Sequence, residues 1–414
     1  MELLRFFTAG NVDDGKSTLI GRLLYDSKSI STDIIETLTR QSKATGGNTE
    51  IDLALLTDGL RAEREQGITI DVAYKYFSTE KRKFIIADTP GHIQYTRNMF
   101  TGASNADLAI ILVDARNGIT DQTKRHSILS SLLGIPHVLV CVNKMDLVDY
   151  SEEVFRKIEK DYLEFAKPLS LKHIHFIPAS ALAGDNVVNA STKMDWFKGP
   201  SILKFLEEIE LHTDEQKESS RFQVQYVIRP QTNDLHDYRG YAGKVLSGSY
   251  QKGQRVVVLP SGIETTIDKI EKHQQEVEIA NSSEPVVIHL KDDVDISRGS
   301  SIVPVEELPK TERELEATIC WMDNTSFQAG QKLLLQQNSF RTKAIVKEVQ
   351  AKIDIHTFEN VESDGTMKLN DICKVLIKTA ENISFDRYST NRSTGAFILI
   401  NENSNNTVAA GTIH

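Results

Sequence analysis

The sequence has few cysteines and no long hydrophobic run. Its 414 residues include only three cysteines, far apart and without CxxC spacing, so neither a disulfide framework nor a zinc site is indicated. No run approaches the ~20 apolar residues that cross a bilayer. The N-terminus lacks the basic and apolar regions of a secretory signal. We therefore expect a cytoplasmic protein with reduced thiols and no membrane segment.

Basic residues are fewer than acidic ones. The chain carries 48 lysines and arginines against 58 aspartates and glutamates, a net charge of −10, which disfavours broad binding to nucleic acid or anionic membrane. The 40% hydrophobic and 26% charged fractions are typical of a folded globular protein. The length suggests about two to four domains.

Apolar runs alternate with amphipathic segments over the first half of the chain. Such runs, separated by helices, predict a mostly parallel sheet with helices on both faces, an α/β domain. Residues 68–77 alternate apolar and polar and predict an edge hairpin with the next strand. The long stretch 29–67 is expected to hold short helices at 33–41 and 52–65. The expected strands are 3–9, 83–87, 108–113, 137–142 and 173–178, and the expected helices are 16–28, 121–133 and 152–166.

Helical periodicity fades near residue 212, and the polar, charged residues 213–220 are expected to form a linker. Short strand-like pieces at regular spacing follow and predict antiparallel barrels or sandwiches, interrupted by a second break at 304–314. We expect domains at residues 1–212, 221–304 and 312–414. The pieces lie at 222–228, 241–247, 255–259, 286–290, 315–322, 342–354, 371–379 and 395–400.

A phosphate-binding loop is predicted between the first strand and the first helix. Glycines let the backbone aim its N–H groups at phosphates, and the helix N-terminus adds roughly half a positive charge. Lys16 would reach the β and γ phosphates, and the Ser17 hydroxyl would ligate Mg²⁺. The plainer alternative, a glycine-rich turn with an exposed lysine, is disfavoured by the flanking strand and helix. The pattern G-x-x-x-x-G-K-[ST] is made by Gly10, Asn11, Val12, Asp13, Asp14, Gly15, Lys16 and Ser17, followed by Thr18.

A base-recognition motif, Asn143-Lys144-Met145-Asp146, follows the strand at 137–142. A carboxylate at Asp146 would accept from N1–H and the 2-amino group of guanine, whereas adenine would leave it unpaired at a cost of about 1–3 kcal/mol. Asn143 would brace the loop, and the Lys144 stem would lie along the base plane. Ser180-Ala181-Leu182, after the next strand, would close the pocket through backbone N–H groups. Alone, the tetrapeptide is often a plain surface turn.

Two further motifs predict a nucleotide-dependent switch. The first, Asp88-Thr89-Pro90-Gly91-His92, ends an apolar strand. Asp88 would hold Mg²⁺ through a water, the small Gly91 would let its N–H sense the γ-phosphate, and His92 would orient the attacking water. A lone histidine is more often a solvated one, but the preceding D-x-P-G favours the catalytic interpretation.

The second switch motif is residues 67–70, where the Thr69 hydroxyl would complete Mg²⁺ coordination only while the γ-phosphate is present. The alternative is a β-branched strand start. Along the chain the five motifs come in the order phosphate loop, switch threonine, 88–92, 143–146 and 180–182. This ordered set predicts an enzyme that binds GTP, not ATP, and hydrolyses it.

These motifs resemble those of elongation factor Tu and, more closely, those of the GTPase subunit (subunit 1, the large subunit) of bacterial sulfate adenylyltransferase. The pair Asp13-Asp14 stands where translation factors usually carry Asp-His. The supporting stretches run almost end to end: 10–28, 58–71, 88–99, 184–188, 238–243, 259–262, 394–400 and 407–411.

The resemblance implies two β-barrel domains after the GTPase domain, with Val12 and Ile68 as an apolar gate around His92. It also implies a small catalytic partner subunit, in a heterodimer or higher assembly, that converts ATP and sulfate to adenosine 5′-phosphosulfate and pyrophosphate. That reaction is strongly uphill, and GTP hydrolysis would help to drive it. Neither an S-G-G-x-D loop nor an HxGH motif is present, so adenylyl transfer is expected on the other chain. A fused adenylylsulfate kinase is not expected.

Two other functions stay open at this point. One is a translation GTPase that carries aminoacyl-tRNA, as elongation factor Tu does. The other is a regulatory GTP sensor with negligible turnover, which His92 disfavours. No arginine finger is assigned, and such a finger supplies ~10³–10⁵ in rate elsewhere. The isolated chain is therefore expected to hydrolyse GTP slowly until its partner docks.

Overall fold

The computed structural model describes residues 2–28, 53, 72–90, 99, 102–103, 105–211, 219–230, 238–354, 357 and 359–414. The chain divides into two compact units, one made of residues 1–211 and one that takes up most of residues 212–414. Within the described residues, no helix is both long and apolar enough to span a bilayer.

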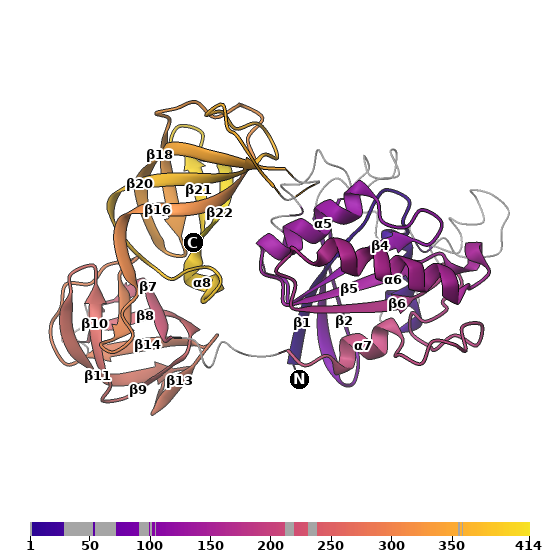
Figure 1. Ribbon diagram of the computed structural model, residues 1–414. Helices are drawn as coiled ribbons and strands as arrows, with labels where there is room; N and C mark the ends of the chain where they lie inside the picture. The colour runs from indigo at the N-terminus through magenta and orange to yellow at the C-terminus, as the bar shows by residue number, and fades with distance from the viewer. Residues whose placement is uncertain are drawn as a thin grey trace. The chain divides into compact units, whose positions relative to one another are not determined.

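The first unit is built on one sheet with the strand order β2-β3-β1-β4-β5-β6 (Figure 1). All neighbours run parallel except β2, which pairs antiparallel with β3 at the edge, as the sequence predicts. Every residue of β4 and β5 is buried, because helices cover both faces. The strands are β1 (Glu2–Ala9), β2 (Ala73–Ser78), β3 (Arg82–Asp88), β4 (Leu108–Asp114), β5 (His137–Asn143) and β6 (His173–Pro178).

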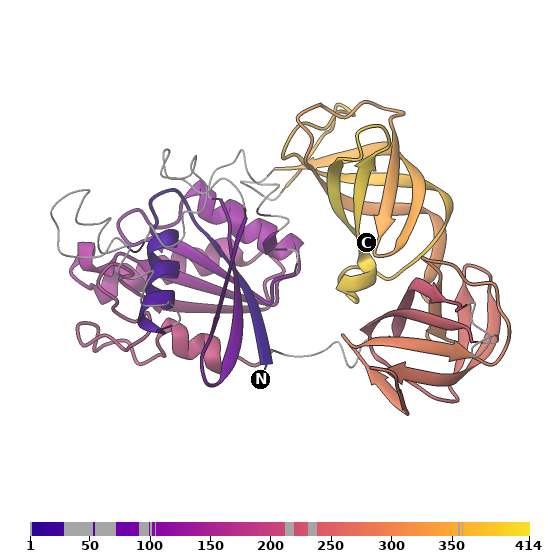
Figure 2. The same cartoon turned by 180° about the vertical axis from the view of Figure 1, so that it is seen from behind.

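The helices of this unit lie on both faces of the sheet. Those of one face, α1 (Lys16–Asp26) and α7 (Ile202–Glu208), share a core with the strands through residues such as Leu19 and Leu206. On the other face lie α5 (Asp121–Leu132) and α6 (Glu152–Ala166), as Figures 1 and 2 show. The sequence did not predict α7. The helices predicted at 33–41 and 52–65 lie, apart from Leu53, outside the described residues.

The second unit consists of two closed antiparallel barrels, which confirms the barrel prediction. The first closes in the order β10-β15-β7-β8-β14-β11 and back to β10, and the second in the order β17-β21-β22-β16-β20-β18 and back to β17. The first has strands β7 (Arg221–Ile228), β8 (Gly240–Ser247), β10 (Arg255–Leu259), β11 (Ile263–Lys272), β14 (Pro285–Leu290) and β15 (Ser301–Pro304), with short strands β9 (Ser249–Gln251), β12 (Gln275–Val277) and β13 (Ile279–Asn281).

The second barrel has a core of its own around the fully buried Trp321. Its first strand already begins at Lys310, so the break between the barrels is shorter than the predicted 304–314. Its elements are β16 (Lys310–Trp321), β17 (Lys332–Gln337), β18 (Phe340–Ile353), β19 (Asn360–Val361), β20 (Ile372–Phe385), α8 (Arg392–Gly395), β21 (Ala396–Asn401) and β22 (Thr407–Ile413).

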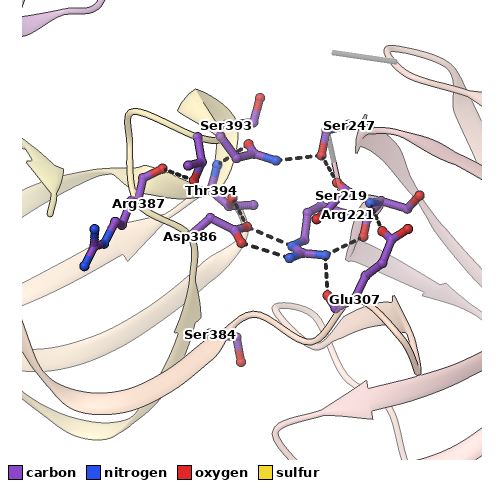
Figure 3. Close-up of polar contacts among 12 residues, drawn as sticks. Ser219, Arg221, Ser247, Glu307, Ser384, Asp386, Arg387, Ser393 and Thr394 are labelled. Atoms are coloured by element: carbon purple, nitrogen blue, oxygen red, sulfur yellow. Dashed lines mark hydrogen bonds and ion pairs between the residues drawn. The ribbon is translucent and has the colours of Figure 1, made fainter. Parts of the chain in front are cut away.

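An ion pair between a buried arginine and a partly buried aspartate joins the two barrels (Figure 3). Arg221 at the start of β7 donates from Nε and Nη2 to the two carboxylate oxygens of Asp386, each at 2.8 Å. Its Nη1 donates to the carbonyls of Ser220 and Glu307 at 2.9 and 2.8 Å. Asp386 also accepts from the Thr394 hydroxyl at 2.6 Å. A bidentate pair with its remaining donors satisfied fixes one relative placement of two elements, so we expect the barrels to act as one body.

Candidate nucleotide site

The polar residues of the predicted motifs gather at one edge of the parallel sheet. Gly10 follows β1, while Asp88 and Asn143 are the last residues of β3 and β5. The strand register pairs Thr8 with Asp88, and Asp114, the last residue of β4, with Asn143. Ligands of open α/β sheets bind outside these carboxyl ends. The topology therefore brings together two motifs that begin 133 residues apart in the sequence, at Gly10 and Asn143.

The phosphate loop holds its lysine in a folded-back position. Lys16 is buried, and its Nζ donates to the carbonyls of Gly10 and Asn11, both at 3.0 Å. Burial lowers the pKa of this ammonium, against the attraction of Asp88 and Asp14. The carbonyls that hold Lys16 are neutral, so a phosphate would be the stronger partner. The arrangement is that of a lysine ready to receive an anion.

The N-terminus of α1 differs from those of the other helices in this unit. The first turns of α5, α6 and α7 are capped by the hydroxyls of Thr120, Ser151 and Ser201. In α1 the cap residue is Gly15, with φ 92°, and no side chain among the described residues caps it. Its first-turn N–H groups carry the positive end of the helix dipole. An anion at this point would supply the missing cap.

Asn143 connects the phosphate loop to the loop after β6. Its Nδ2 donates to the Asp14 carbonyl at 2.7 Å, and its Oδ1 accepts from the Ala181 N–H at 2.9 Å. A Cβ at Gly15 would lie 2.5 Å from that Nδ2. A side chain at Gly15 would therefore displace Asn143 from both loops, which gives this glycine a steric role besides its left-handed φ.

Asp13 and Asp14 differ in their surroundings. Asp13 is exposed, with φ 70°. Asp14 is 3% exposed, and its carboxylate accepts from the Asn11 N–H at 2.7 Å. The Asn11 side chain in turn accepts from the Val12 N–H at 2.9 Å. Burial raises the pKa of Asp14, against the hydrogen bond from Asn11. Asp14 thus braces the front of the loop, whose first N–H groups are already occupied.

One carboxylate oxygen of Asp146 is an acceptor without a hydrogen-bond partner in the described part of the chain. This residue lies in the short 3-10 helix η3 (Met145–Val148), whose Met145 is buried. Asp146 Oδ1 is buried and has no hydrogen-bond partner within the described part of the chain. A buried carboxylate oxygen without a donor is costly, so a ligand with N–H donors is the natural partner. N1–H and the 2-amino group of guanine are such donors.

The loop of Ser180, Ala181 and Leu182 is tied to its neighbours. The Ala181 N–H, one of the N–H groups that we expect to close the pocket, donates to Asn143 Oδ1. Arg22 of α1 donates to the Ala181 carbonyl at 3.1 Å and also to that of Leu182. The Leu182 side chain is exposed. The loop is thereby held beside the phosphate loop.

Hard oxygen groups suited to Mg²⁺ lie beside Lys16. Ser17 and Thr18 are in the first turn of α1, and Asp88 is buried at the end of β3, where Oδ1 accepts from the Thr8 hydroxyl at 3.2 Å. Thr89, next to Pro90, donates to the Thr8 carbonyl at 2.6 Å. The described residues contain no cluster of three or more His, Cys, Asp or Glu that would hold a metal by itself.

Four predicted site residues lie outside the described part of the chain: Ile68, Thr69, Gly91 and His92. Two described residues that lie near the predicted ones were not indicated by the motifs. One is Asp114, a buried carboxylate that holds Lys144. Its only sequence signal is a charged residue directly after the apolar run 108–113.

The other unpredicted residue is His126 of α5, which is buried with Nδ1 3.0 Å from the Met99 sulfur. Burial, and after it the charge of Lys16, lowers the pKa of His126 to about 3. The imidazole is therefore neutral at physiological pH and adds no second positive charge beside Lys16.

Two family models match parts of the chain. Residues 1–217 match the model of the elongation factor Tu GTP binding domain, and residues 314–414 match the GTP-eEF1A C-terminal domain-like model. Among solved structures, the chain is similar to sup35 complexed with GDP, with 20% identity and a TM-score of 0.45 over 100% of this chain and 93% of that one.

Curated relatives match along the whole chain. Sulfate adenylyltransferase subunit 1 of Colwellia psychrerythraea is 50% identical over 414 residues, which cover 100% of this chain and 88% of that protein. The protein of the same name from Pseudoalteromonas atlantica is 50% identical, over 100% and 87%. That of Bacteroides thetaiotaomicron is 48% identical, over 100% and 86%. The chain belongs to the elongation factor Tu-type GTPases and, among them, to the family of sulfate adenylyltransferase subunit 1.

Proposed function

We propose that this GTPase couples GTP hydrolysis to the formation of adenosine 5′-phosphosulfate and pyrophosphate from ATP and sulfate. The adenylyl transfer would take place on a separate small catalytic subunit. The open carboxylate oxygen of Asp146, beside the loops held by Asn143, supports guanine as the base. Full-length identity of about half to relatives with the subunit 1 name supports the sulfate reaction.

Different residues of the site would bind the phosphates of GTP, hold Mg²⁺ and orient the attacking water. Lys16 and the first turn of α1 would bind the phosphates, since both present positive charge at the same edge of the sheet. Ser17, Asp88 and Thr69 would hold Mg²⁺, which neutralises charge that develops on the phosphate oxygens. His92 would orient the attacking water, with Val12 and Ile68 as apolar neighbours. The products are GDP and inorganic phosphate.

We also propose a partner subunit, a cellular location and domain limits for this chain. The partner is the small catalytic subunit, bound in a heterodimer or larger assembly. The cytoplasm is supported by the three cysteines, which are all free and buried. The domain limits 1–212, 221–304 and 312–414 are supported, to within two residues at the start of β16, by the division of the chain near residue 211 and by the two barrels.

GTP hydrolysis by the purified chain tests the proposal. We expect slow release of phosphate from the chain alone and a stimulation of at least ten-fold when the small subunit, ATP and sulfate are all present, because no arginine finger is assigned within the chain. Omitting sulfate is the internal control and should remove most of the stimulation. Stimulation by ribosomes and indifference to sulfate would instead show a translation GTPase that carries aminoacyl-tRNA.

A further inference from the structure

The strand β4 ends in a buried carboxylate that holds two cations. Asp114 is 2% exposed. Its Oδ1 accepts from the backbone N–H and from Nε of Arg116, both at 3.0 Å, and its Oδ2 accepts from Arg116 Nη2 at 2.7 Å. Lys144 Nζ lies 3.0 Å from the same Oδ2. Neither the phosphate loop nor the switch motifs account for this cluster.

Lys144 is held at both ends. Its backbone is left-handed, with φ 63°, and its ammonium is fixed on Asp114. The main chain before it is fixed to the same strand end, because the Ala115 N–H donates to the Asn143 carbonyl at 2.9 Å. The Lys144 stem therefore spans a set distance between β5 and β4. A long flexible side chain is thereby ordered before any ligand arrives.

We propose that Asp114 is a positioning residue for guanine-nucleotide binding, which stretches Lys144 across the base pocket beside the open carboxylate of Asp146. This inference rests on the nucleotide site proposed above. The lysine stem would form an apolar wall for the flat face of the base, while Asp146 recognises its edge. Because Asp114 fixes that wall in advance, the bound nucleotide does not have to order it.

Arg116 helps to keep the carboxyl group of Asp114 ionised. Burial alone would raise the pKa of Asp114, but the hydrogen bonds from Arg116 and Lys144 outweigh burial and lower this pKa to about 2. Asp114 is therefore ionised at physiological pH and able to hold the ammonium. Arg116 is half exposed, and the charge of Asp146 also attracts it. Arg116 thus steadies Asp114 from the solvent side.

A double-mutant cycle on nucleotide affinity distinguishes positioning from a merely structural ion pair. The four proteins are the wild type, Asp114→Asn, Lys144→Met and the double variant, and the readout is the Kd for fluorescent GDP. If Asp114 acts through Lys144, its substitution has no further effect once the ammonium is gone. We expect about a ten-fold weaker affinity in each single variant and again about ten-fold, not a hundred-fold, in the double variant.

Turnover provides a second readout. At saturating GTP the Asp114→Asn variant should hydrolyse at the wild-type rate with a raised KM, since Asp114 holds the base side of the pocket. The matched control is Glu159→Gln, which removes a carboxylate paired with Arg156 on the exposed face of α6. Its Kd should equal that of the wild type.

Different outcomes of these measurements would overturn the positioning role of Asp114 and the nucleotide site itself. An unchanged Kd in Asp114→Asn, or additive losses in the double variant, overturns the positioning role while the nucleotide site stands. A wild-type chain that binds no guanine nucleotide overturns the site itself. If Asp114→Asn does not fold, Arg116→Gln replaces it in the cycle, with a two- to five-fold loss expected that disappears in the Lys144→Met background. An unchanged Kd or an additive loss in that cycle overturns the inference in the same way.

Discussion

Replacing Asp146 with asparagine is expected to move the nucleotide preference from guanine to xanthine. The buried Oδ1 has no protein donor within the described residues, so in our account it accepts from guanine. Asparagine would place an amide N–H where guanine also presents N–H. Xanthine carries a carbonyl at that position and would restore the match. Two hydrogen bonds to a charged group, at about 1.5–3 kcal/mol each, correspond to at least about a hundred-fold loss of GDP affinity.

Titration of the wild type and of Asp146→Asn with fluorescent GDP and its xanthine counterpart measures this exchange. The matched control is Asp149→Asn, which removes the same charge from an exposed residue three positions along. The φ of Asp149 is 51°, which suits asparagine. The Asp149→Asn variant should still prefer guanine nucleotides. An Asp146→Asn variant that binds GDP as tightly as the wild type would contradict our assignment of the base pocket.

Removal of the carboxylate that joins the barrels is the second large effect. In Asp386→Ala, the Arg221 guanidinium would stay buried without its counter-charge, and the Thr394 hydroxyl would lose its acceptor. Breaking a buried pair in this way costs about 3–5 kcal/mol. We expect the free energy of unfolding of the second unit to fall by about that amount, while GTP binding by the first unit is unaffected.

Denaturant unfolding of the full chain, followed by the fluorescence of the buried Trp321, measures this loss. The chain has two tryptophans, so Trp196→Phe in all samples leaves Trp321 as the reporter. The control is Glu314→Ala, whose partner Lys347 is half exposed and whose loss should cost no more than about 1 kcal/mol. Equal midpoints for Asp386→Ala and Glu314→Ala would refute the joining role.

The elements of the first unit were predictable where local signals agree. Residues 173–178 and 152–166 were predicted as a strand and a helix and are β6 and α6 with those bounds. The helix has a serine cap, acidic residues in its first turn and a regular apolar face. The phosphate loop and its helix followed from a motif that requires a strand before it and a helix after it.

The remaining features depend on pairings between distant residues. Lys144 meets Asp114 only because β4 and β5 are neighbours with Asp114 opposite Asn143. Arg221 and Asp386 are 165 residues apart, and neither lies in a recognisable motif. The predicted break at 304–314 was too long, because the polar start of β16 is exposed and lacks the apolar alternation of a half-buried strand.

The final yield of adenosine 5′-phosphosulfate shows whether GTP hydrolysis on this chain drives its formation. The purified chain and the small subunit are incubated with fixed ATP and sulfate, together with GTP, a non-hydrolysable GTP analogue or no guanine nucleotide. Hydrolysis that drives an uphill reaction must raise the final yield above the equilibrium reached without it. If hydrolysis is coupled to adenylyl transfer, we expect a higher yield only with GTP, in proportion to the GDP released. The same yield under all three conditions would contradict this coupling.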